Sequence, residues 1–408
     1  MAILKSAAPA ASIALGVASL AQAADLRLSS PSAGDQVPAA LVASRDAAAT
    51  RTLDRMPTRI SWALDAADAL NDRPVPFVRE SREYWLDASE AQLQRGVALP
   101  TTADAALIRI SPHGNNPSRL TVDDLVIRNG ARELAGRAAT QNVADETSLR
   151  AAGMDVPDGT VIAKLATAVG KGDLRLVAPT ARGSYLIHVF EPASSTVLTL
   201  GTTRDTILAG QSLRISARLD GARATSAKGV LTAPDGHSQP FDLRPQADGS
   251  WQADVVPDAA HASGLELWEV HTFASGGDRS TPVLRDAKTA FALSRPTARL
   301  TGDVRTVADP ARGGGLSLDI GVQAANGSRY QLAGVLYGTA SDGTRRPLAY
   351  AQSAAWLDAG SGRLALTFDA ASMAAGKLAA PYELRDLRLT NQADMSLVER
   401  RERAVEIR

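Results

Sequence analysis

The chain has 408 residues, and its 44 Lys and Arg residues balance 44 Asp and Glu residues. The absence of cysteine excludes disulfides, thiolate zinc sites, iron–sulfur clusters and cysteine nucleophiles. No run of five like charges occurs, so nucleic acid is not an expected partner, because duplex affinity depends on a clustered cationic face. A chain of this length is expected to form roughly two to four domains.

The N-terminus has the pattern of a secretory signal peptide. Lys5 precedes an apolar run from Ala7 to Leu20, and residues 21–23 read Ala-Gln-Ala, which fits the A-x-A cleavage rule. A membrane anchor, the alternative, needs about 20 strongly apolar residues, whereas this run is shorter and rich in Ala and Ser. We expect residues 1–23 to be removed, and the mature protein to be periplasmic or secreted with no transmembrane segment.

Residues 24–58 are rich in Ala, Ser and charge and poor in aromatic residues, so they can bury little surface. This composition predicts a leader of low order with one short helix over 39–55. We expect ordered structure to begin at Ile60, where aromatic and polar residues start to mix as they do on a pleated surface.

Residues 59–191 are predicted to form a β-rich N-terminal domain with minor helix. In residues 184–190, apolar side chains fall on both faces of a strand, because successive side chains point to opposite sides. A strand that is apolar on both faces is predicted to lie at the centre of a sandwich. A single helical turn is expected at 88–93 and a helix at 143–152. The remaining strands are predicted at 60–64, 83–87, 97–100, 106–110, 120–127, 161–165 and 173–177.

Only short strands follow, at a spacing of roughly 8–12 residues that is typical of β-sandwiches. Val230-Leu231 precedes Asp235-Gly236 in the same way that Val335-Leu336 precedes Asp342-Gly343. This internal repeat predicts two immunoglobulin-like domains, at 196–294 and 297–408. The predicted fold class is therefore mainly β, with tandem β-sandwiches.

The chain resembles an uncharacterised family of exported bacterial proteins, the domain of unknown function 4785. The resemblance rests on the signal peptide, the stretch from Tyr84 to Ser89 and on through Leu99-Pro100 to Pro112, and the two β-units after Pro192. It implies export, possible release from the cell, and an N-terminal domain followed by two immunoglobulin-like domains. It implies no catalytic residues.

The chain contains no G-x-S-x-G elbow, phosphate loop or H-E-x-x-H zinc helix. His113 and His237 fall in predicted turns and His261 in a loop, while His188 and His271 fall in apolar strands, where a hydrogen-bonded imidazole is the commoner role. We therefore predict no catalytic, cofactor-binding or metal-binding residues.

Carboxylates could still supply a hydrolytic pair or a calcium site. The closest pairs are Asp123 with Asp124 and Glu266 with Glu269, but residues one or three apart on a strand face opposite sides. Calcium is the alternative ion. Its candidate ligands, Asp235, Asp248, Asp258 and Asp278, lie in predicted turns, where Asp is common for backbone reasons alone.

Flat aromatic faces could also bind sugars. Four tryptophans fall in predicted strands and are expected in cores. Trp356, in a weaker strand context, is the one most open to exposure, although core packing is favoured over ligand contact there too.

These features favour an exported, non-catalytic binding or structural protein that presents sandwich surfaces to a protein or glycan partner. Two alternatives stay open. One is a secreted hydrolase of polysaccharide or peptide with a carboxylate site in the N-terminal domain. The other is an accessory subunit of a partner enzyme. An immunoglobulin-like fold does not decide among them, because it hosts many functions.

Overall fold

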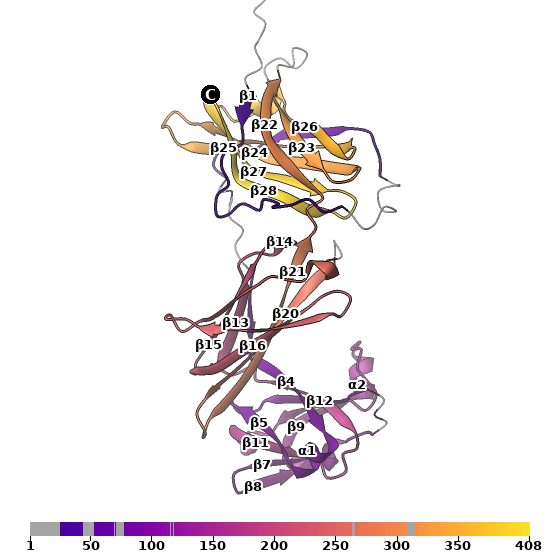
Figure 1. Cartoon of the computed structure of the whole chain (residues 1–408). Helices are drawn as coiled ribbons and strands as arrows, with labels where there is room; N and C mark the ends of the chain where they lie inside the picture. Colours follow the sequence, from indigo (N-terminus) through magenta and orange to yellow (C-terminus); the bar gives the residue numbers. More distant parts are fainter. Residues whose placement is uncertain are drawn as a thin grey trace, which may run out of the picture.

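The computed structural model describes residues 25–43, 53–68, 70, 77–114, 116, 118–262, 266–307 and 315–408. Strands dominate these residues and the helices are few and short, which confirms the predicted mainly-β class. Within these described ranges, six sheets form three sandwiches. The sandwiches follow one another along the molecule, with the C-terminal domain at the top of Figure 1, the middle domain below it and the N-terminal domain at the bottom.

The N-terminal domain packs a five-stranded sheet against a four-stranded sheet. The first has the order β4-β12-β6-β10-β9, with the bounds Glu83–Ser89, Ser184–Phe190, Leu107–Pro112, Val161–Leu165 and Thr140–Asp145. The second has the order β5-β11-β7-β8, with the bounds Val97–Thr101, Gly172–Val177, Val126–Asn129 and Arg132–Ala135. Side chains from both sheets, such as Ile187 and Leu174, fill one apolar core between them.

Short helices connect some of these strands, and capping residues stabilise the start of each of the two α-helices. Ser89 and Gln92 form a capping box at the start of α1 (Glu90–Arg95), and Asp145 caps α2 (Glu146–Ala151). The predicted strand over 120–127 is shorter in the structure, because Thr121 and Asp124 close the 3-10 turn η1 (Val122–Asp124) before β7 begins. Two further 3-10 turns are η2 (Gly136–Ala138) and η3 (Thr167–Val169).

The middle domain has two five-stranded sheets. The order β18-β19-β15-β13-β3 has the bounds Arg244–Pro245, Trp251–Val255, Leu213–Asp220, Val197–Thr202 and Val78–Ser81. The order β14-β21-β20-β16-β17 has the bounds Thr206–Leu208, Pro282–Ser294, Leu267–Gly277, Ala224–Thr232 and Ser238–Asp242. A 3-10 turn, η4 (Ala259–His261), lies between β19 and β20. Trp268, which has no exposed surface, packs near Phe291 in the core.

The C-terminal domain repeats this plan. Its four-stranded sheet has the order β1-β22-β23-β26, with the bounds Asp25–Arg27, Ala298–Val307, Leu316–Ala324 and Gly360–Phe368. Its five-stranded sheet has the order β2-β25-β24-β27-β28, with the bounds Thr58–Ala63, Arg345–Leu357, Ser328–Thr339, Ala379–Asn391 and Ser396–Ile407. The helix α3 (Ala370–Ala375) follows β26. The run β25-β24-β27-β28 has the same order as β17-β16-β20-β21 in the middle domain, as an internal repeat requires.

The N-terminal segment differs from its prediction. Residues 24–58 were expected to form a leader of low order, but β1 pairs with β22, Gln36 forms a β-bridge with Arg400, and β2 pairs with β25. The strand predicted from Ile60 therefore belongs to the C-terminal domain and not to the N-terminal one, while β3 joins the middle domain through β13. The physical reason is that any sheet edge offers the same unpaired backbone groups, so local alternation does not choose among edges.

Other expectations for this segment fall on residues outside the described ones. The signal peptide at 1–23 lies outside them, and so does 44–52, most of the helix expected over 39–55. The flanking residues 39–43 and 53–55 are not helical. No helix within the described ranges is long and apolar enough to cross a membrane.

The turn between β20 and β21 leads to a pH-dependent prediction. Asp278 accepts hydrogen bonds from the backbone and hydroxyl groups of Ser280 and Thr281, and these lower its pKa from 3.8 to about 2, the Ser280 hydroxyl contributing most. A carboxyl group with a lowered pKa stabilises the folded state above its unfolded pKa, and this contribution is lost as the pH falls through about 2.

We therefore expect Asp278→Ala to lower the urea midpoint at pH 7 and to leave it nearly unchanged at pH 2. Asp278→Asn is the matched control, since it keeps an acceptor for the turn and removes the charge, so its effect should vary little with pH. A carboxyl titration by NMR that places the Asp278 pKa near 4 would contradict the prediction.

Candidate functional site

The structure disperses three of the five histidines. His113 is exposed and lies near Asp87, with 3.4 Å between Nδ1 and Oδ1. His188 stacks on Trp85 and bonds to Glu83 at 2.9 Å, and this hydrogen bond is the largest cause of the lowered pKa of Glu83. His271 Nε2 lies 3.4 Å from the buried Asp286. Each of these imidazoles therefore lies beside a single carboxylate.

The two carboxylate pairs singled out in the sequence have separate contacts. Asp124 accepts hydrogen bonds from Thr121 and Thr180, whereas Asp123 lies 3.6 Å from Arg137. Glu269 is paired with Lys288 at 3.0 Å, and Glu266 is exposed. In neither pair do the two carboxylates share contacts around one site, as the acid–base catalysis of a glycosidase would require.

Trp62, which was expected in a core, is exposed, whereas Trp356, the tryptophan predicted to be most open to exposure, is not. Trp356 is half-buried in β25, where the guanidinium of Arg55 lies 4.1 Å from its ring and Asp358 accepts a hydrogen bond from its indole. Trp62 is the exposed one, at 45%, because it lies on the edge strand β2. Sequence alternation placed Trp62 in a strand but did not show that this strand would lie at an edge, and it did not extend the strand before Trp356 far enough to include that residue.

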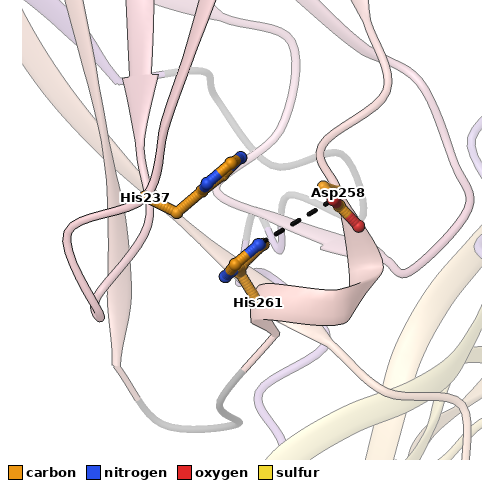
Figure 2. A group of neighbouring side chains, drawn as sticks. All are labelled: His237, Asp258 and His261. Carbon is orange, nitrogen blue, oxygen red and sulfur yellow. Dashed lines mark ion pairs between the residues drawn. The ribbon is translucent and has the colours of Figure 1, made fainter.

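The remaining two histidines meet on the middle domain. His237 follows β16 in the hairpin turn to β17, and His261 ends η4 (Figure 2). Their rings stack at a centroid distance of 3.9 Å with 1° between the ring planes. Asp258 completes the group: its Oδ2 lies 3.9 Å from His261 Nε2, and the ligand atoms of all three residues lie within 4.8 Å of one another.

A second carboxylate orients this group, which we call the His–Asp cluster (His237, Asp258 and His261). Asp235 Oδ2 pairs with His261 Nδ1 at 2.6 Å, and this hydrogen bond is the largest cause of the lowered pKa of Asp235. The other oxygen of Asp235 accepts a hydrogen bond from the backbone of His237 at 3.0 Å. Asp235 therefore holds both histidines.

Local backbone contacts fix the two segments that carry the cluster. Asp258 caps η4 by accepting a hydrogen bond from Ala260 N at 2.8 Å through Oδ1, which leaves Oδ2 facing the histidines. Gln239 on β17 joins the segments, since its amide donates to Val256 O and its oxygen accepts from Asp258 N. Two imidazoles and a carboxylate in this arrangement are donors suited to a divalent metal ion.

Sequence reasoning noted all four residues separately and predicted no metal site. It kept calcium as an alternative on the four aspartates, of which the structure brings together Asp235 and Asp258. Asp248 instead accepts hydrogen bonds from Ser250, and Asp278 holds its own turn. The available signal was the pair of short spacings, Asp-Gly-His at 235–237 and Asp-x-x-His at 258–261. Each spacing alone is common in turns.

Comparison with curated proteins gives no match. Among solved structures, this chain is similar to the crystal structure of a DUF4785 family protein from Legionella pneumophila subsp. pneumophila str. Philadelphia 1, with a TM-score of 0.72 and 22% sequence identity. The similarity covers 91% of this chain and 99% of that one, and at this identity it concerns the fold. The profile of the DUF4785 (domain of unknown function) N-terminal domain matches residues 49–191, and that of the DUF4785 C-terminal domain matches residues 297–408. This chain therefore belongs to the DUF4785 family.

Proposed function

We propose that this protein is an exported, non-catalytic binding or structural protein whose three sandwiches are held at fixed positions to present their surfaces to a protein or glycan partner. The observation that carries the proposal is the buried polar contact at both joints between domains. Domains in one chain move relative to one another by default. Buried, specific contacts at a joint oppose that motion.

At the joint between the N-terminal and middle domains, Arg285 of β21 pairs with Glu191 at 2.6 Å, and neither side chain is exposed. Glu191 also accepts hydrogen bonds from the backbone of Thr102 and Ala103. The next residue of β21, Asp286, accepts a hydrogen bond from Trp85 N on β4 at 2.7 Å. One strand of the middle domain therefore contacts the N-terminal domain at two places, at Glu191 directly after β12 and at Trp85 within β4.

At the joint between the middle and C-terminal domains, residues 32–37 lie between the two sandwiches. On the C-terminal side, Asp35 accepts a hydrogen bond from Glu402 N at 2.7 Å. On the middle side, Arg204 donates to the Asp35 carbonyl at 3.2 Å, and Gln36 donates to the Thr206 carbonyl at 2.5 Å. The N-terminal segment therefore ties the two domains together.

Strand β9 lies at a sheet edge and carries little protection against pairing with another chain. Lys, Arg and Pro residues normally discourage such pairing. The sequence of β9, Thr140–Asp145, contains none of them, and Val143 there is 42% exposed. By contrast, β17 contains Pro240 and β18 contains Arg244. Addition of a partner strand to β9 is the route of recognition we favour.

Export is part of the proposal and rests on residues 1–23. The A-x-A pattern ends at Ala23, two residues before β1 begins. Cleavage there would leave a mature N-terminus next to a strand paired with the C-terminal domain.

The hydrolase alternative has less support. A depression of about 370 Å³ in the N-terminal domain has Asp123, Asp145 and Glu146 among its lining residues. Asp145 caps α2, Glu146 is paired with Arg119 at 2.8 Å, and Asp123 lies near Arg137. The structural contacts of these carboxylates favour a role in folding.

The test is capture by the immobilised mature protein from periplasm, envelope and culture medium, compared with two variants. We expect Val143→Lys to reduce recovery of the partner several-fold, because a lysine on the edge opposes strand addition. Val256→Lys is the matched control, since Val256 is 51% exposed but lies on the middle domain. Failure to recover any reproducible partner would refute the binding function, and equal recovery with Val143→Lys would refute the β9 route.

A further inference from the structure

We propose that the His–Asp cluster binds a divalent transition-metal ion of the Zn²⁺ type, with His261 Nε2, Asp258 Oδ2 and a ring nitrogen of His237 as ligands. This site goes beyond the proposed binding function and does not depend on it. It lies on the middle domain, whereas the β9 edge belongs to the N-terminal domain.

The hydrogen bond to Asp235 determines which nitrogen of His261 can bind a metal. An ionised carboxylate only accepts hydrogen bonds, so the 2.6 Å contact places the proton of a neutral His261 on Nδ1. Nε2 then carries the lone pair, and it is the nitrogen that faces Asp258 at 3.9 Å. A carboxylate that accepts from the second nitrogen is the usual support of a metal-bound histidine, because it fixes the ring and raises its basicity.

The donors need only small movements to reach coordination distance. Zn²⁺ bonds of about 2.0–2.2 Å in tetrahedral geometry place the ligand atoms about 3.3–3.6 Å apart, and the three donors already lie within 4.8 Å of one another. The parallel rings must separate, because the lone pair of a histidine lies in its ring plane. His237 is exposed and can turn while Asp235 holds its backbone.

The donor set also determines the class of ion. Imidazole suits Zn²⁺, Cu²⁺ and Ni²⁺, whereas Ca²⁺ requires six to eight oxygen ligands. The cluster therefore favours a transition metal over the calcium considered from the sequence. Three protein ligands leave a fourth position of a tetrahedral ion for water or for a group from a partner.

Calorimetric titration of the untagged mature protein with ZnCl₂ tests the proposal, and we expect saturable binding of one ion per chain. His237→Ala and His261→Ala should each weaken binding by more than tenfold. Asp235→Asn, which keeps every ligand, should weaken it by about 10-fold to 100-fold. His113→Ala is the matched control, because His113 is also exposed and also lies beside an aspartate, and it should bind as the unaltered protein does.

Two further measurements keep the result interpretable. Unchanged denaturation midpoints would show that the variants are folded, which we expect since these side chains lie at the surface. In NMR spectra, Zn²⁺ should shift the imidazole signals of His237 and His261 and leave those of His113 unchanged. The proposal is overturned if no saturable binding occurs, if His237→Ala and His261→Ala bind Zn²⁺ normally, or if Ca²⁺ displaces Zn²⁺ at equal concentration.

Discussion

Replacing Arg285 with methionine should lower the free energy of unfolding by about 3–5 kcal/mol, because the substitution leaves the carboxylate of Glu191 buried without its cation. Neither side chain of this pair is exposed. Arg285 also donates to the hydroxyl groups of Thr102 and Ser194, and each of these would lose one of its hydrogen bonds. Denaturant unfolding of the whole chain, followed by tryptophan fluorescence, measures the effect.

Two comparisons separate the buried charge from the general effect of losing an arginine. Arg218→Met removes a cation paired with Asp220 at a site where both side chains are about half exposed, and it should cost at most about 1 kcal/mol. The double variant Arg285→Met with Glu191→Leu leaves no unpaired charge, so it should be more stable than Arg285→Met alone. If Arg285→Met were as stable as Arg218→Met, Glu191 would not be isolated from water.

Arg285→Met also tests whether the joint between the N-terminal and middle domains is fixed, as the proposed function requires. We expect the radius of gyration from small-angle scattering to increase in Arg285→Met under conditions where each domain remains folded. No change would mean that the contact of Asp286 with β4 is sufficient to hold the joint.

Replacing Asp35 with alanine should lower the free energy of unfolding by about 3 kcal/mol, because its side chain is 1% exposed and accepts charge-assisted hydrogen bonds. Glu402 N would lose a partner at 2.7 Å, and Ser32 N would lose one at 3.0 Å. Arg401, which is 8% exposed and lies 3.7 Å from this carboxylate, would lose a nearby negative charge.

Limited proteolysis with trypsin should show that the effect of Asp35→Ala is localised to the N-terminal segment. Once Asp35 no longer holds the segment against β28, trypsin should cleave faster after Arg27, because local opening exposes the backbone of β1 to the protease. Asp303→Ala is the matched control, since Asp303 faces Arg27 across the same pairing at 3.8 Å but is 55% exposed, so the change should cost at most about 1 kcal/mol. If both variants resisted trypsin equally, Asp35 would not be the anchor of the segment.

The sequence by itself determined local features, namely individual strands and turns. Alternation over residues 184–190 predicted β12 with its observed bounds, because side chains of a strand alternate between faces whatever its neighbours are. Pro234-Asp235-Gly236 predicted the turn between β16 and β17, since Gly236 adopts a φ of 87° that other residues rarely reach. The order of strands in the middle and C-terminal sandwiches likewise agrees with the repeat seen in the sequence.

Only the tertiary structure decided the contacts between residues far apart in the chain. It placed β1 and β2 in the C-terminal domain, and it buried Arg285 of one domain against Glu191 of another. It also brought His237, from the turn between β16 and β17, to Asp258 and His261, which lie together at η4. Spacing and alternation describe a residue's own segment, whereas the edge, joint or side chain that it meets depends on how complete sheets pack. For that reason the family and the fold class could be recognised from the sequence, while the candidate metal site and the joints between domains could not.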